Sequence, residues 1–96
     1  MITLKKPIEF EWDYGNRDKN VDKHDVTTRE AEEVFFDAKR KIAKDFLHSK
    51  IEDRYLLIGS TTKDRKLFIV FTLRQQKVRV VSARDLNRKE YGLLIK

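Results

Sequence analysis

The 96-residue sequence predicts a single α+β domain, residues 1–96, in which an antiparallel sheet packs against helices. Three observations support this fold class. An early segment alternates apolar and acidic residues, the next stretch has helical periodicity, and the second half contains three segments rich in β-branched and aromatic residues. We therefore expect a three-strand meander plus an N-terminal strand around one core, which a chain of this length has room to build.

The first expected element is a strand at residues 8–12, which read Ile-Glu-Phe-Glu-Trp. Alternation of this kind is typical of a half-buried strand. Residues 13–16 follow as a turn. Residues 17–24 are polar apart from Val21, so they fit only a short helix that ends at His24.

The clearest local signal is the start of a helix at residues 27–30. Thr27 and Glu30 have the spacing of a capping box, in which each side chain accepts a hydrogen bond from the other residue's backbone. One helical stripe then contains Ala31, Val34, Phe35, Ala38 and Ile42. We expect this helix to reach about residue 38, and residues 39–46 fit either its continuation or a strand.

The second half predicts three strands, at residues 54–61, 66–74 and 77–84. Short polar links join them, which favours an antiparallel meander. The middle strand is apolar on both faces, so we expect it to be central and covered by helices. Asn87 is placed to cap a last helix that begins at Arg88.

Charge is distributed unevenly along the chain. Residues 1–48 contain 10 Lys and Arg against 11 Asp and Glu, whereas residues 49–96 contain 12 against 5. A concentrated basic surface attracts polyanions, of which nucleic acid is the commonest in cells. The other interpretation is that these cations only keep a small domain soluble.

Arginines at strand ends are candidates for phosphate binding, because a guanidinium makes forked hydrogen bonds to phosphate oxygens. The candidates are Arg54, Arg74, Arg79 and Arg84. Four arginines on three neighbouring strands point to one shared groove, although a solvated strand end or a salt bridge explains each one alone. Strict alternation in the last strand places Val80 and Arg84 on one face and Arg79 and Ala83 on the other.

The composition excludes several kinds of site. The chain has no Cys and only two His, so we expect no metal site, and no cofactor is predicted because no phosphate-cradling glycine-rich loop is present. No apolar run is long enough to cross a membrane and no signal peptide is visible, which predicts a cytoplasmic protein. His24 is suited to proton transfer near neutral pH, but from the residues alone a stabilising contact with a helix C-terminus is the favoured interpretation.

An ordered set of short motifs runs through residues 9–91. Its pieces are FEWD at 10–13, NVDKHDV at 20–26, EA at 30–31, VFFD at 34–37, HS at 48–49, EDR at 52–54, VFT at 70–72 and RVVSAR at 79–84. In this order the sequence resembles the BrnT family of type II toxin–antitoxin systems, small RNA-cleaving toxins related in fold to RelE. Two departures are Asp25, where the family usually has Gly, and Tyr91, which directly follows Glu90.

The resemblance implies an endoribonuclease that cuts RNA without a metal and inhibits growth until it is neutralised. Its implied catalytic residues are His24, Arg54, Arg74, Arg84 and Glu90. Arg84 and Arg74 would stabilise the pentacoordinate phosphorane and Arg54 would hold a flanking phosphate. His24 would transfer a proton, with Glu90 as the alternative. Further RNA contacts would come from Lys23, Arg65 and Arg79.

The resemblance also implies a partner, a small BrnA-like antitoxin that carries the DNA-binding element for the operator. An acidic or amphipathic antitoxin segment would then cover the basic groove. Two other interpretations stay open at this point. One is a non-catalytic basic module that binds nucleic acid, and the other is an inactive homologue retained to bind the antitoxin.

Overall fold

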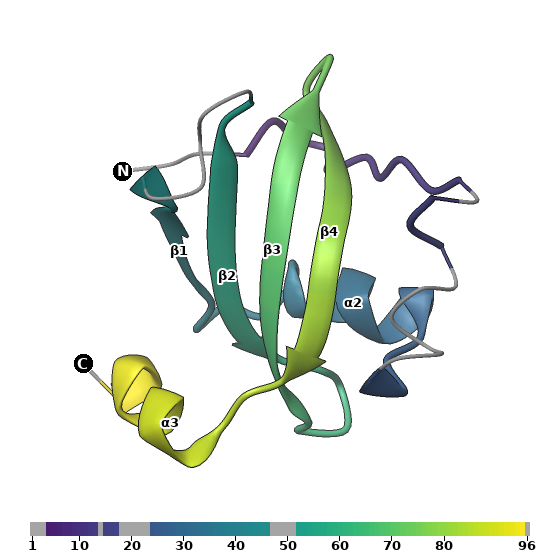
Figure 1. Cartoon of the computed structure of the whole chain (residues 1–96). Coiled ribbons are helices and arrows are strands. Elements are labelled where there is room, and N and C mark those ends of the chain that lie inside the picture. The colour runs from purple at the N-terminus through teal and green to yellow at the C-terminus, as the bar shows by residue number, and fades with distance from the viewer. Residues whose placement is uncertain (1–3, 14, 18–23, 47–51, 96) are drawn as a thin grey trace.

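A four-stranded antiparallel sheet forms the centre of the computed structural model, which describes residues 4–13, 15–17, 24–46 and 52–95 (Figure 1). The strands pair in chain order and are β1 (Lys41–Lys44), β2 (Arg54–Ser60), β3 (Lys66–Arg74) and β4 (Lys77–Asp85). Helix α2 (Thr28–Val34) lies behind the sheet in Figure 1, and α3 (Arg88–Ile95) lies beyond its lower end. The α+β class predicted from the sequence is confirmed.

The prediction of an N-terminal strand at residues 8–12 is wrong. Phe10 makes a single parallel bridge with Val78, and the pairing consists of two backbone hydrogen bonds of 2.8 Å on either side of it. Beyond this bridge, the buried side-chain amide of Asn16 connects the segment to β4. Its Nδ2 donates to the carbonyls of Glu11 at 3.0 Å and Val80 at 3.2 Å. The fourth strand is β1 instead, in the range that fitted either a helix or a strand.

Helix α2 begins as predicted and ends earlier. The Thr27 hydroxyl accepts from the Glu30 N–H at 3.1 Å, and Glu30 accepts from the Thr27 N–H at 3.1 Å, so the capping box is confirmed. The helix stops at Val34 rather than near Ala38, which is exposed. The chain turns there because the Asp37 carboxylate accepts from the backbone of Ser60 in β2 at 2.7 Å.

The core lies between α2 and one face of the sheet. Phe35, fully buried, makes edge-to-face contacts with Phe71 and Phe10 at ring-centroid distances of 5.1 and 5.2 Å. Helix α2 covers only this face of β3, although the sequence predicted helices on both. Phe68 and Val70 on the other face are therefore only partly buried.

A β-bulge changes which residues of β4 share a face. Phe71 pairs with Val80, whereas the preceding Val70 pairs with Ser82, so Val81 is an extra residue in β4. Val80 and Ala83 are both fully buried in the core. Arg79 and Arg84 consequently lie together on the opposite face. The strict alternation expected from the sequence is wrong beyond Val80.

Two local features of the fold, the start of α3 and the backbone at Asp25, agree with the sequence. Helix α3 begins at Arg88 after a second capping box, in which Asn87 and Glu90 each accept from the other's backbone N–H at 3.0 Å. Asp25 adopts a left-handed conformation with φ of 56°, a backbone that favours Gly and that Asp tolerates better than most residues. Among the described residues, no helix is long and apolar enough to cross a membrane.

Candidate functional site

The sheet face opposite α2 carries the four strand arginines, and we call it the arginine face: Arg54, Arg74, Arg79 and Arg84. It faces the viewer in Figure 1. Arg54 and Arg79 flank Thr72 of β3, whereas Arg84 is paired with Phe68. At about 3.3 Å per residue, these two rows are roughly 13 Å apart, and Arg74 is roughly 20 Å from the Phe68 row. The structure therefore separates the arginines into two groups rather than one groove. The first group is Arg54, Arg74 and Arg79, and the second is Arg84 with the residues around it.

Arg79 belongs to the first group and is held by two carboxylates. Its Nη1 donates to Asp13 at 2.7 Å and to Glu11 at 3.1 Å, and its Nη2 donates to Asp13 at 3.1 Å. Its side chain is only 15% exposed. The hydrogen bond from Arg79 is the main reason that the pKa of Asp13 is lowered. The positive charge of Arg79 is therefore already balanced by carboxylates of the chain itself.

Arg74 is the most accessible of the first group. Its side chain is 48% exposed, and its hydrogen bonds to Glu52 are long, at 3.5 Å each. Glu11 lies 3.9 Å from Nη1 and so stands between Arg74 and Arg79. A phosphate displaces such weak, exposed pairs at small cost, because exposed ion pairs contribute little.

Arg84 forms the centre of the second group. Its guanidinium makes a forked pair with Glu90, at 2.9 and 2.8 Å, and stacks over the ring of Phe68 at 4.3 Å from the centroid. The hydrogen bond from Arg84 is the main cause of the lowered pKa of Glu90. Glu90 is therefore a carboxylate at neutral pH.

Arg65 connects the second group to the loop before α2. Its donors reach Asp85 at 2.7 and 3.1 Å and Glu30 at 3.0 Å, and they also reach the carbonyls of Asp25 at 2.8 Å and His24 at 3.3 Å. A guanidinium has five N–H donors, and these contacts use all five. Arg65 thus positions other residues and has no donor left for RNA.

His24 is brought to the same end of the sheet as Arg84. The hydrogen bond from Arg65 dominates the lowering of the Asp85 pKa, and the charge of His24 adds a smaller contribution. Asp85 directly follows Arg84, whose Nη1 donates to the Asp85 carbonyl at 3.1 Å. His24, Arg84 and Glu90 therefore gather at one end, whereas Lys23 lies outside the described residues.

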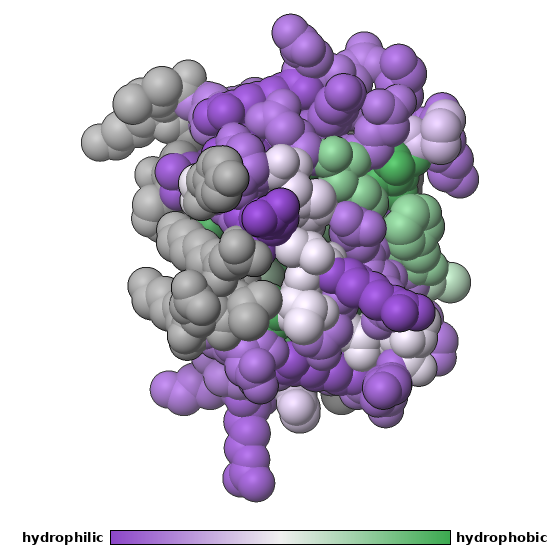
Figure 2. All heavy atoms as spheres, turned by 90° about the vertical axis from the view of Figure 1, so that its right-hand side faces the viewer, coloured by the Kyte–Doolittle hydropathy of each residue, from purple (hydrophilic) through white to green (hydrophobic). Residues whose placement is uncertain are grey.

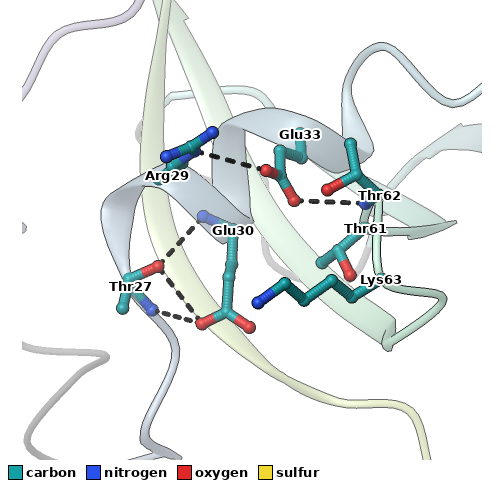
Figure 3. Close-up of a pocket in the computed structure, with 7 residues that line it drawn as sticks. All are labelled: Thr27, Arg29, Glu30, Glu33, Thr61, Thr62 and Lys63. Carbon is teal, nitrogen blue, oxygen red and sulfur yellow. Dashed lines mark hydrogen bonds and ion pairs between the residues drawn. The ribbon is translucent and has the colours of Figure 1, made fainter.

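A cavity of about 370 Å³ opens beside this end, between the start of α2 and residues 61–63 (Figure 3). Its acidic side chains have structural partners. Glu30 completes the capping box, and Glu33 accepts from the Thr62 N–H at 3.1 Å and pairs with Arg29 at 3.5 Å. We therefore assign this cavity to the bracing of α2 rather than to the site.

Sequence reasoning missed the partners of the arginines. Glu11 and Asp13 hold Arg79, Asp85 holds Arg65, and Phe68 supports Arg84. The salt-bridge alternative considered for single arginines is realised at Arg74, Arg79 and Arg84. One available signal was the acidic alternation at residues 9–11, which places carboxylates on the side of the arginines.

One family comparison and one search of curated proteins bear on this site. The family model described as "Ribonuclease toxin, BrnT, of type II toxin-antitoxin system" matches residues 12–90, and this range includes both groups of arginines as well as His24 and Glu90. No curated protein was found to match the chain. Because the family match spans most of the sequence, the chain belongs to the BrnT family of ribonuclease toxins of type II toxin–antitoxin systems.

Proposed function

We propose that the protein is a metal-independent endoribonuclease whose cleavage site is the second group on the arginine face. The forked pair of Arg84 and Glu90, with His24 at the same end of the sheet, is the observation that carries this proposal. Arg84 supplies a fixed cation, Glu90 an ionised carboxylate and His24 an imidazole. Family membership supports RNA as the substrate.

The reaction is a transfer of the phosphoryl group to the neighbouring 2′-hydroxyl. Glu90 accepts the proton of this hydroxyl while the O2′–P bond forms. The P–O5′ bond then breaks, and the leaving 5′-oxygen takes a proton from His24. The products are a 2′,3′-cyclic phosphate and a free 5′-hydroxyl. Arg84 stabilises the additional negative charge of the phosphorane, where a preorganised donor has most effect.

The first group holds the RNA on one side of the cut. Arg74 and Arg54 contact flanking phosphates, since roughly 20 Å along the sheet corresponds to several phosphates of one strand. Arg79 contributes once Asp13 or Glu11 is displaced from it. Lys23 remains a further RNA contact in this proposal, and Arg65 is a positioning residue.

The partner is a BrnA-like antitoxin that neutralises the toxin and carries the operator-binding element. Family membership supports a protein antitoxin. One observation favours a second candidate function, an inactive homologue retained for antitoxin binding. Arg79 and Arg84 are both compensated by carboxylates of the chain itself, which weakens their attraction for RNA.

Cleavage in the presence of EDTA tests the proposed function. The proton transfers and the stabilising cation all come from side chains, so we expect a labelled single-stranded RNA to be cut at an unchanged rate in excess EDTA. The products should carry 2′,3′-cyclic phosphate and 5′-hydroxyl ends. Binding of the RNA without any cleavage would instead support a non-catalytic module.

Replacement of Glu90 tests the proton acceptor. Glu90→Gln keeps Oε1 as the acceptor for the Asn87 N–H and for Arg84 Nη1, but it loses the charge and the second hydrogen bond of the fork, and we expect cleavage at pH 7 to fall about 100-fold. Because the pKa of Glu90 is lowered from 4.5, the wild type should keep this base ionised down to at least pH 5. Steady-state cleavage rates measure both effects. The control is Glu9→Gln, an exposed carboxylate beside Lys77, and equal rates for the two variants would contradict the assignment.

A further inference from the structure

A second surface lies on the α2 side of the sheet, away from the arginine face. It is a pocket of about 520 Å³, and the lining residues used in the argument are Lys6, Pro7, Ile8, Phe36 and Arg40. Figure 2 shows apolar surface gathered toward the α2 side of that view, on a molecule that is otherwise mostly hydrophilic. We call this surface the Phe36 pocket.

Phe36 is the apolar centre of the surface. Its side chain is 64% exposed although it follows the fully buried Phe35. Its ring contacts Phe10 at a centroid distance of 6.4 Å, and this one aromatic contact leaves most of the ring open to solvent. An exposed aromatic ring at the edge of a pocket is the kind of residue that dominates protein–protein binding energy.

The cations around the Phe36 pocket are uncompensated. In the described ranges, no ion pair involves Lys6, which lines the pocket, or Lys39, which lies in sequence between the lining residues Ala38 and Arg40. Arg40 donates from Nη1 to the backbone carbonyl of Asp37 at 3.3 Å, and its buried Nε has no acceptor. The Asp37 carboxylate is already bound by the backbone of Ser60 and Lys39.

This charge pattern differs from that of the arginine face. There, Arg79 and Arg84 are paired with carboxylates of the chain itself. An acidic partner on that face has to displace those carboxylates, whereas around the Phe36 pocket it meets open cations. The Phe36 pocket is therefore the stronger electrostatic match for an acidic protein segment.

We propose that the Phe36 pocket is the anchoring site of the antitoxin, and that it takes an antitoxin segment with an apolar side chain flanked by carboxylates. The apolar side chain packs on Phe36 and Ile8, and the carboxylates reach Lys6, Lys39 and Arg40. This proposal rests on the proposed function for the existence of an antitoxin partner. It places the anchor on the opposite side of the sheet from the RNA site.

RNA is the other macromolecule that a basic, aromatic surface attracts. The observations favour a protein segment because Pro7 and Ile8 line the pocket beside Phe36, and aliphatic surface of this kind gives no hydrogen bonds to bases. The pocket is also separated by the whole sheet from the residues assigned to cleavage. RNA binding there is an outcome that the experiment below distinguishes.

Titration of the purified full-length protein with its cognate antitoxin tests the proposal. We expect Phe36→Ala to weaken antitoxin binding at least 30-fold, as removal of a central aromatic anchor does. Lys39→Glu should weaken it and reduce its salt dependence. The matched control is Phe46→Ala, because Phe46 is 80% exposed and follows β1, whereas Phe36 and Arg40 precede that strand. We expect this control to bind within twofold of the wild type.

Three results overturn the proposal. The first is wild-type antitoxin affinity in Phe36→Ala. The second is a loss of RNA cleavage in Phe36→Ala with unchanged antitoxin affinity, which assigns the pocket to RNA. The third is a wild-type dimer in light scattering that Phe36→Ala dissociates, with antitoxin affinity unchanged, which assigns the pocket to a second copy of the chain. Because antitoxin affinity is measured without RNA, a failure of the cleavage proposal leaves this test intact.

Discussion

Arg84→Ala is expected to reduce RNA cleavage about 100-fold or more, the largest effect of any single substitution on activity. The guanidinium stabilises charge that develops only in the transition state, so the loss should appear in kcat and kcat/KM alike, with little change in KM. Single-turnover cleavage of a labelled RNA measures it directly. Arg84→Lys keeps the charge but loses the fork, and it should fall between the wild type and Arg84→Ala.

The matched control for Arg84 is Arg88→Ala, which removes an exposed cation from the start of α3. We expect its activity to stay within about threefold of the wild type, because charge on this part of the surface contributes mainly to salt-dependent RNA attraction. Circular dichroism of each variant separates a lost reaction from a lost fold. Equal activity of the two variants would remove Arg84 from the reaction.

Arg65→Ala is expected to give the largest loss of stability, about 2 kcal/mol in the free energy of unfolding at pH 7. The substitution leaves the carboxylates of Asp85 and Glu30 and the carbonyls of His24 and Asp25 without their shared donor. The figure is moderate because the Arg65 side chain is 26% exposed. Urea unfolding followed by Trp12 fluorescence measures it, with the exposed Lys63→Ala as the control.

The pH dependence of this loss identifies its cause. Arg65 lowers the pKa of Asp85, and its hydrogen bond, together with that of the Thr27 backbone, outweighs the opposing effect of burial at Glu30. Groups with lowered pKa stabilise the fold above their ordinary values of 3.8 and 4.5, and this stability is lost as pH falls through the folded values. The difference between the wild type and Arg65→Ala should therefore shrink as the pH falls below 4.5 and then below 3.8. An unchanged difference would show that packing, rather than charge, is what the substitution removes.

Local signals were sufficient for the parts of the fold that are formed by neighbouring residues. The helix caps at Thr27 and Asn87 depend on contacts three residues apart, and the sequence predicted both caps, although it indicated the full capping box only at Thr27. The hairpins of β2, β3 and β4 follow from composition and short polar links. The end of α2 was missed because a bond from Ser60 to Asp37, 23 residues apart, decides it. The helical periodicity of the sequence carries no information about a contact between residues so far apart.

The candidate site was predicted in its residue types rather than in its arrangement. The sequence indicated arginines on adjacent strands, and they are on adjacent strands. Their separation into two groups depends on strand register, and their pairing depends on carboxylates contributed from other segments, such as Asp13 for Arg79 and Glu90 for Arg84. Register and long-range ion pairs arise only when the strands meet, so composition cannot supply them.

The extra residue in β4 gives that strand one residue of spare length beside the site. Deletion of Val81 would leave a regular strand in which Ala83 still pairs with Ile69 and Arg84 with Phe68, so Ala83 stays buried and Arg84 stays on the arginine face. Deletion of both Val81 and Ser82 would exchange inside for outside and drive the Arg84 guanidinium into the core. Laboratory libraries that sample deletions in β4 should therefore recover folded members that lack Val81 alone, and almost none that lack both residues.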